Sequence, residues 1–232
     1  MMKRNNFPFS AVLGLNHAKT AILIVLVNPR AGGLLISGPR GIGKSTLMRS
    51  TQELIERPWR DIPVSVTEDR LFGTIDTEKA IYSGQKKLYP GIINEADQGV
   101  LYLDDANLLR EDLLDFILNI AEVGAYQLER DGLSLRCDTS FTVIAAINPE
   151  SGMLSGACLD QFGLFVNVDN IHDENTRVEI LKRTISFEKD CASFCKLWKL
   201  ENEKIKKAIH SAMSLLPKVV VSSAMIQLAS VY

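Results

Sequence analysis

The residues best suited to chemistry form a glycine-rich stretch that ends in a lysine and two hydroxyl residues. The stretch reads Gly38, Pro39, Arg40, Gly41, Ile42, Gly43, Lys44, Ser45, Thr46. Its first and last glycines, the lysine and the serine have the spacing of a phosphate-binding loop, in which backbone N–H groups turn inward around an anion. We expect all nine residues to bind a nucleotide. Lys44 would reach its β and γ phosphates, and Ser45 would ligate Mg²⁺.

Two carboxylates form the second part of the predicted site. Asp104 and Asp105 directly follow the apolar run 99–103. An aspartate at the end of such a strand can hold the Mg²⁺ shell, so Asp104 is predicted to be a metal ligand alongside Ser45. The neighbouring carboxylate of Asp105 is predicted to orient or deprotonate the attacking water.

A polar side chain follows a third apolar run. Asn148 comes after residues 141–147 and precedes Pro149. Alone, an Asn-Pro pair indicates only a turn. After a phosphate loop and an acidic strand end, its amide is suited to hydrogen-bond the γ phosphate or the water. The predicted catalytic residues are therefore Lys44, Asp105 and Asn148, with ATP and Mg²⁺ as cofactors.

These residues need a scaffold that brings strand ends together, and the hydropathy pattern predicts one. Short apolar runs bounded by turn residues are typical of strands buried on both faces. Strong runs span 33–37, 99–103 and 141–147, and weaker ones span 63–66 and 164–168. Helical patterns span 44–56 and 108–123, and 129–136 has the pattern of half a hairpin around Asp131-Gly132. This alternation predicts an α/β fold, a parallel sheet with helices on both faces.

The pattern changes after Val168. Helical patterns span 173–187 and 201–216, and the next apolar run of strand type is 218–221. We therefore expect a nucleotide-binding core over residues 1–170 and a small helical lid over residues 171–232. On the first lid helix, Arg177 and Arg183 are expected on a solvated face, with contact to a neighbour's nucleotide as the alternative.

The composition is that of an ordinary globular protein of 232 residues. Its 26 basic and 28 acidic residues give a net charge of −2, which offers no electrostatic basis for nonspecific nucleic-acid binding. The strongest apolar run, 21–27, is far shorter than the roughly 20 residues of a membrane span. The N-terminal segment has no apolar stretch of signal-peptide type, so we expect a cytoplasmic protein without membrane contact.

The cysteines indicate neither a disulfide framework nor a metal site. They are Cys137, Cys158, Cys191 and Cys195. A secreted framework is usually denser in a shorter chain, so we expect small buried thiols. Cys191 and Cys195 lie four apart on one helix face, but no further Cys or His stands nearby at matching spacing to complete a metal site.

Several blocks beyond the phosphate loop resemble the ATPase subunit I of magnesium chelatase, an AAA+ protein of the P-loop NTPase class. The blocks lie at 28–33, 67–76, 89–109, 129–136, 146–150 and 159–163. The resemblance is specific because the blocks occur in the family's order, from about Phe7 to Arg183. Segment 9–15 is similar to the family's N-terminal entry near the adenine, and Asn148 resembles the sensor-1 residue of AAA+ ATPases.

The resemblance implies a homo-oligomeric ring with ATP between neighbouring protomers. In that family, subunit I assembles with a D-type subunit, and together they drive a large catalytic subunit that inserts Mg²⁺ into protoporphyrin IX. The implied function is an ATPase that couples MgATP binding and hydrolysis to metal insertion by a partner subunit. MoxR-type relatives, which remodel other metalloproteins, provide an alternative.

Three departures from the family pattern bear on hydrolysis. The family has glutamate where this chain has Asp105, and an arginine finger where it has Gln161. A neutral amide cannot neutralise developing phosphate charge. The family's sensor-2 arginine has no identifiable counterpart, so the lid is expected to be incomplete.

Two further functions are alternatives, the first because of these departures and the second because of the predicted hairpin. One is a nucleotide-binding assembly or regulatory subunit that hydrolyses ATP poorly. The other is a DNA-remodelling motor that inserts the hairpin near Asp131-Gly132 into DNA. The second is disfavoured because the hairpin carries mixed charges without a basic stripe.

Overall fold

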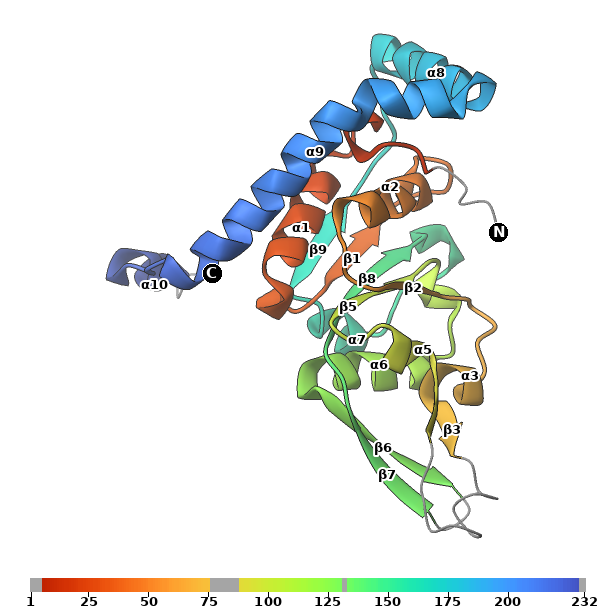
Figure 1. The fold of residues 1–232 in the computed structure, drawn as a ribbon, viewed down its shortest axis with the longest axis vertical. Helices are drawn as coiled ribbons and strands as arrows, with labels where there is room; N and C mark the ends of the chain where they lie inside the picture. Colours follow the sequence, from red (N-terminus) through yellow and green to blue (C-terminus); the bar gives the residue numbers. More distant parts are fainter. Residues whose placement is uncertain (1–5, 76–87, 131–132, 230–232) are drawn as a thin grey trace.

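A five-stranded parallel sheet forms the centre of the molecule (Figure 1). The computed structural model describes residues 6–75, 88–130 and 133–229. The strand order is β2-β5-β8-β1-β9, and all four pairings are parallel. The strands are β2 (Trp59–Ile62), β5 (Gly99–Leu103), β8 (Phe141–Ile147), β1 (Leu34–Ser37) and β9 (Leu164–Asn167). The expected buried parallel sheet is confirmed, and the carboxyl ends of β1, β5 and β8 meet at one edge.

Helices cover both faces of this sheet, as expected. Alternate residues of β1 enter different cores, since Leu35 packs in one cluster with α6 while Leu34 packs in the other with α1 and α2. The helices of the core are α1 (Asn16–Val27), α2 (Lys44–Thr51), α3 (Glu68–Phe72), α5 (Ile92–Glu95), α6 (Glu111–Val123) and α7 (Gly156–Asp160). Short 3₁₀ turns are η1 (Phe9–Ala11), η2 (Pro29–Ala31), η3 (Gln52–Leu54), η4 (Ala106–Leu108) and η5 (Pro149–Ser151).

The edge strand of the core differs from the sequence prediction. The edge strand spans Trp59–Ile62 instead of 63–66. It pairs with β5 as far as Ile62, and Pro63, which has no amide hydrogen, follows where the ladder ends. The apolar run 21–27 lies in α1, where it packs on the sheet.

Two antiparallel hairpins project from the end of the molecule opposite α8 (Figure 1). They pair β3 (Gly73–Ile75) with β4 (Leu88–Pro90), and β6 (Ala125–Arg130) with β7 (Leu133–Asp138). Tyr126 anchors the second hairpin, because its hydroxyl donates to Phe72 O at 2.8 Å and lies 2.7 Å from Asn94 Oδ1. A hairpin was predicted here, although its Asp131-Gly132 turn lies outside the described residues.

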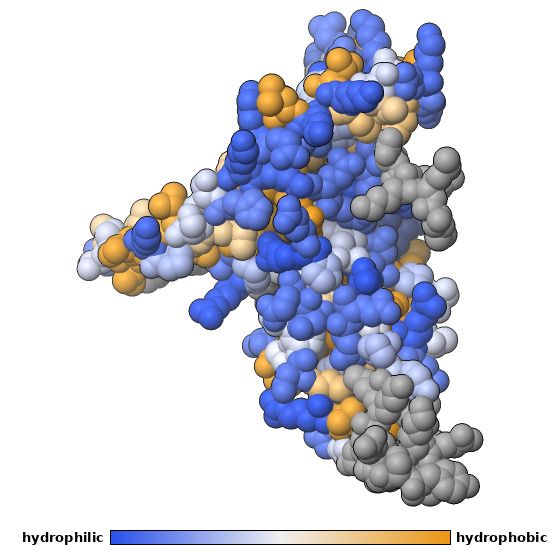
Figure 2. All heavy atoms as spheres, in the orientation of Figure 1, coloured by the Kyte–Doolittle hydropathy of each residue, from blue (hydrophilic) through white to orange (hydrophobic). Residues whose placement is uncertain are grey.

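The C-terminal region is helical: α8 (Glu174–Lys189), α9 (Cys191–Leu215), η6 (Leu216–Lys218) and α10 (Ser223–Ala229). The second of these helices, α9, begins ten residues before the predicted position 201, because Asp190 caps it by accepting from Ser193 N at 3.0 Å. Segment 218–221 is not a strand, and Val220 is 86% exposed. Apolar side chains also gather on the arm that carries α10 (Figure 2).

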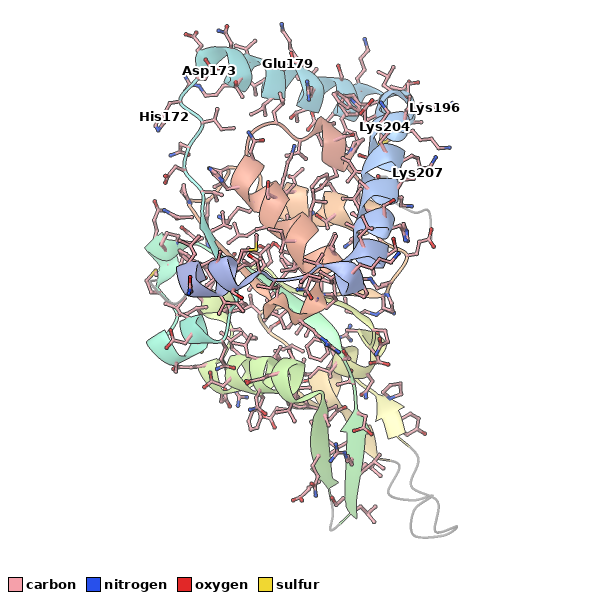
Figure 3. All side chains as sticks on the ribbon, turned by 90° about the vertical axis from the view of Figure 1, so that its left-hand side faces the viewer. His172, Asp173, Glu179, Lys196, Lys204 and Lys207 are labelled. Carbon is pink, nitrogen blue, oxygen red and sulfur yellow. The ribbon has the colours of Figure 1, made fainter. Side chains whose placement is uncertain are left out.

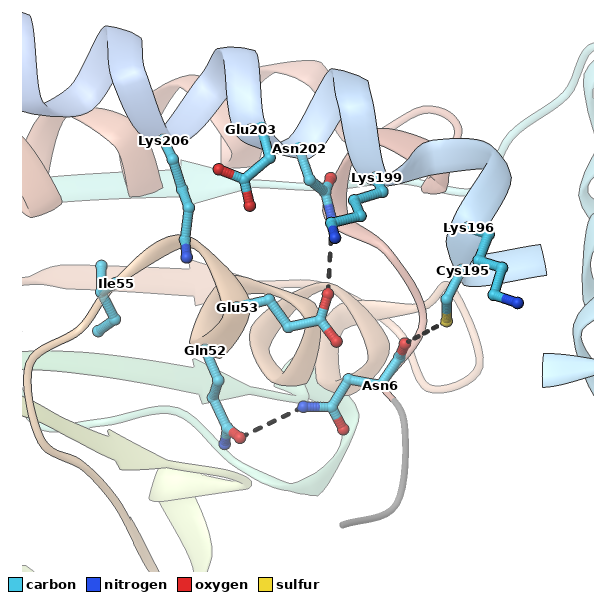
Figure 4. A pocket seen from close by; sticks show the side chains of 10 residues that line it. All are labelled: Asn6, Gln52, Glu53, Ile55, Cys195, Lys196, Lys199, Asn202, Glu203 and Lys206. Atoms are coloured by element: carbon cyan, nitrogen blue, oxygen red, sulfur yellow. Dashed lines mark hydrogen bonds between the residues drawn. The ribbon is translucent and has the colours of Figure 1, made fainter. Parts of the chain in front are cut away.

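Polar contacts hold α9 against the core. The buried Asn202 side chain accepts from Ser10 N at 2.9 Å and donates to Glu53 Oε2 at 3.4 Å. These residues adjoin a cavity of about 650 Å³ between η3 and α9 (Figure 4). Cys195 also lines it. Cys195 and Cys191 are both half-buried, so the expectation of small buried thiols is wrong for this pair.

Arg183 holds α8 in place, which corrects the prediction of a solvated position. Its side chain is 19% exposed and pairs with Glu179 at 2.9 Å. The guanidinium donates to Ala11 O at 3.0 Å and lies over the Trp198 ring at 4.6 Å. Arg177 is exposed, as predicted. Glu179 lies on α8, whereas Lys196 and Lys204 lie on α9 (Figure 3). Among the described residues, no helix has the length and apolar character to cross a membrane.

Candidate functional site

The predicted phosphate loop connects the buried strand β1 to α2. Gly41 and Gly43 have φ of +82° and +92°, a region that side chains with a Cβ rarely adopt. A Cβ on Gly38 would lie 2.4 Å from Val168 O, so close approach of β9 requires glycine there. The loop therefore has the backbone of a tight anion cradle at the N-terminus of a helix.

Lys44 lies under the loop rather than in solvent. Its side chain is buried, and Nζ donates to Gly38 O at 2.5 Å and to Pro39 O at 2.8 Å. Burial lowers the pKa of this amine, while the carboxylates of Asp105 and Asp104 oppose the shift. The ammonium therefore lies at the loop, and its hydrogen-bond partners in the described part of the chain are two backbone carbonyls.

Ser45 and Asp104 come together from two elements 59 residues apart. Ser45 Oγ, in the first turn of α2, donates to Asp104 Oδ1 at 3.2 Å at the end of β5. A hydroxyl and a carboxylate oxygen at this separation are a donor set suited to Mg²⁺, which prefers oxygen ligands. The two predicted metal ligands are thus adjacent.

Asp105 lies next to this pair but turns outward. Its backbone is left-handed, with φ of +50°, and its carboxylate lies 3.9 Å from Arg40 Nη2 of the phosphate loop. The Arg40 side chain is 65% exposed and that of Asp105 is 37% exposed, so solvent weakens this ion pair. The carboxylate is therefore free to reorient.

Asn148 ends β8 beside β5, and its side chain caps its own turn. Oδ1 accepts from Glu150 N at 3.3 Å, and Nδ2 donates to Ser151 Oγ at 3.1 Å. Sequence reasoning missed Asn107, whose Nδ2 donates to Asn148 O at 3.1 Å and to Gly152 O at 2.9 Å. Asn107 stands only three residues after Asp104, but it belongs to no motif spacing that would have identified it from the sequence.

Gln161 lies away from this chain's phosphate loop. It follows α7 and precedes β9, so it stands at the amino-end edge of a parallel sheet whose carboxyl-end edge carries the loop. Its Nε2 donates to Ala157 O at 3.4 Å on a half-exposed surface. Any contact between Gln161 and a nucleotide must therefore involve another protomer.

Comparisons with known proteins agree with this geometry. Residues 33–161 match the AAA domain (dynein-related subfamily). The chain is 35% identical to the magnesium-chelatase 38 kDa subunit of Rhodobacter capsulatus over 92% of this chain and 70% of that protein. It is 33% identical to the magnesium-chelatase subunit ChlI homolog of Methanocaldococcus jannaschii, over 99% of this chain and 73% of that protein. The chain belongs to the magnesium-chelatase I-subunit family of AAA ATPases.

A solved structure in this family supports the same fold. The complex between subunits BchI and BchD of magnesium chelatase, based on a cryo-EM reconstruction at 7.5 Å, matches with a TM-score of 0.68 and 35% identity. The match covers 93% of this chain and 77% of the matched chain of the complex. This match and the AAA domain match support the same architecture for this chelatase I-subunit-like ATPase: an AAA core with a parallel sheet, followed by a helical C-terminal region.

Proposed function

We propose that this protein binds MgATP and hydrolyses it as a motor subunit whose ring drives metal insertion by a partner subunit. The observation that carries the proposal is the 3.2 Å approach of Ser45 Oγ to Asp104 Oδ1 beside the glycine-rich loop. Family membership supports ATPase chemistry, and the BchI–BchD structure supports a D-type partner. The ring and a large catalytic subunit that acts on a tetrapyrrole belong to the same proposal.

The binding roles follow from the geometry. Residues 38–46 would hold the phosphates through backbone N–H groups, and Lys44 would exchange its two carbonyl partners for phosphate oxygens. Ser45 and Asp104 would hold Mg²⁺, which when bound neutralises charge on the β and γ phosphates. Within the chain, residues 1–170 would act as the nucleotide-binding core and 171–232 as the lid.

Hydrolysis would depend on two groups beside the metal ligands. Asp105 would leave its solvated pairing with Arg40 to orient or deprotonate the attacking water. Asn148 Nδ2 has a second N–H besides the one given to Ser151, and this group would hydrogen-bond the γ phosphate or the water.

A phosphate-release assay tests the proposal. We expect turnover well above that of Lys44→Ala, and nucleotide binding that requires the intact loop. If the wild-type chain binds nucleotide but releases phosphate no faster than Lys44→Ala, the motor assignment fails and the hydrolysis-deficient assembly role stands. Asp105 and Gln161 are the observations that favour this second candidate.

Two other candidates receive less support. A MoxR-like remodelling ATPase would share the same site but act on a different metalloprotein, and pull-down of a chelatase-type catalytic subunit would separate the two. A DNA-remodelling role would use the β6–β7 hairpin, whose described side chains pair Arg136 with Asp138 at 3.0 Å instead of forming a basic stripe. A salt-dependent shift with single-stranded DNA would support it.

A further inference from the structure

The hydroxyl of Tyr102 is a buried polar group with no partner in the part of the chain that the structure describes. Tyr102 lies on β5, and the residue is 3% exposed. Asn107 Oδ1 is the other such atom among the described side chains, and it too lies close to the acidic turn. Because buried polar groups are nearly always hydrogen-bonded, an orphaned hydroxyl at this position requires an explanation.

The surroundings of Tyr102 orient its hydroxyl toward the candidate metal ligands. Tyr102 lies on β5, and Asp104 directly follows the strand end two residues later, so strand alternation favours the same side for both side chains. The ring packs against Trp59, with centroids 5.9 Å apart, in the core cluster that contains Met48 of α2. Its polar end lies close to the side chains of Asp104 and Ser45.

We propose that Tyr102 is a positioning residue whose hydroxyl donates to the Asp104 carboxylate when Ser45 and Asp104 hold Mg²⁺. This inference rests on the proposed MgATP site. Asp104 Oδ1 already accepts from Ser45, but a carboxylate has about four lone-pair sites and can accept from Tyr102 as well. Groups that hydrogen-bond a ligating carboxylate fix its orientation, and their loss typically weakens metal binding 10–100-fold.

The test measures nucleotide binding rather than turnover. Fluorescent ADP is titrated onto full-length wild type and Tyr102→Phe, first in EDTA and then at a series of Mg²⁺ concentrations. We expect equal affinities in EDTA and, for Tyr102→Phe, a rise of roughly 3–10-fold in the Mg²⁺ concentration that gives half-maximal enhancement. In an Asp104→Ala background the same substitution should have no further effect, because Tyr102 acts through Asp104.

Tyr126→Phe is the matched control, because it removes a half-buried hydroxyl that donates to Phe72 O at 2.8 Å far from the loop. We expect it to lower the thermal midpoint and to leave the Mg²⁺ dependence unchanged. Tyr102→Phe should not lower the midpoint of the metal-free protein, since its hydroxyl has no partner to lose. An unchanged Mg²⁺ dependence in Tyr102→Phe, or an equal loss of affinity in EDTA, overturns the inference. A wild type that binds no nucleotide overturns the proposed function itself.

Discussion

The side-chain amide of Asn107 donates to the main-chain carbonyl of Asn148 at 3.1 Å. This bond joins the turn after β5, which carries the two aspartates, to the turn after β8. A second bond from the same amide, to Gly152 O at 2.9 Å, closes the connection. Asn107 thus fixes the distance between the predicted base and the predicted sensor, although it was not expected to touch either.

Replacing Asn107 should impair turnover more than nucleotide binding. Asn107→Ala removes two hydrogen bonds and should cost about 1–3 kcal/mol of unfolding free energy. We expect kcat to fall about 10-fold or more, with nucleotide affinity within about two-fold, because the phosphate loop is unaffected. Phosphate release and urea unfolding measure the two effects. Gln127→Ala, on the exposed hairpin, is the control, and an equal loss of kcat there would show that the effect is not specific.

The length of the carboxylate at position 105 should set the hydrolysis rate. Asp105→Glu adds one methylene and lets the carboxylate reach farther toward the nucleotide edge, so we expect kcat to rise about 10-fold. Asp105→Asn should reduce turnover to that of Lys44→Ala while leaving nucleotide affinity intact. Phosphate release at saturating MgATP distinguishes these cases. A Glu variant slower than wild type would show that the shorter side chain is already matched to its position.

The core of this site could be predicted from sequence because the information is local. Spacing alone identified the loop from Gly38 to Thr46, and the strand ends placed Asp104 and Asn148 at one edge. The surroundings of the Tyr102 hydroxyl and the hydrogen-bond partners of Asn107 could not be predicted, because they depend on how β5 packs against α2 and β8. Arg183 was predicted on a solvated face for a similar reason. Its contacts with Ala11 and Trp198 form only when the C-terminal helices pack on the N-terminal segment.

Restoring an arginine at position 161 should accelerate hydrolysis only between protomers. Gln161 stands at the sheet edge opposite its own phosphate loop, so Gln161→Arg can supply charge only to a neighbour's nucleotide. We expect a gain of at least 10-fold that grows with protein concentration. When this variant is mixed with an Asp105→Asn chain that retains Gln161, mixed interfaces should keep some activity but not the gain. At such an interface Asp105 meets Gln161, and the introduced arginine meets a site that lacks Asp105. A gain independent of protein concentration would contradict action across an interface.

Arg183 should contribute more to stability than Arg177 on the same helix. Arg183→Ala removes a hydrogen bond to Ala11 O, an ion pair with Glu179 and stacking on Trp198. We expect a loss of about 1–3 kcal/mol, because the side chain is largely buried and charge-assisted bonds are the stronger ones. Arg177→Ala, at an exposed position, should change stability by less than about 0.5 kcal/mol. Equal unfolding midpoints for the two variants would show that Arg183 does not anchor α8.

Glu53 of η3, at the cavity beside α9, should make stability depend on pH (Figure 4). Burial raises the pKa of its carboxyl above the ordinary value of 4.5, against the effects of the Asn6 backbone and Lys206. The folded state therefore holds this proton more tightly than the unfolded state, and stability is lost as pH rises from about 4.5 through the raised folded-state pKa. Glu53→Gln keeps an acceptor for Asn202 and removes the buried charge.

We therefore expect Glu53→Gln to raise the thermal midpoint by about 1–3 °C at pH 7–8 and to have little effect near pH 4.5. Glu203→Gln, an exposed residue at the same cavity, should change the midpoint equally little at both pH values. Calorimetric scans at the two pH values measure the difference. A midpoint gain for Glu53→Gln that is the same at both would contradict the assigned titration, because a neutral carboxyl in acid leaves no charge for the substitution to remove.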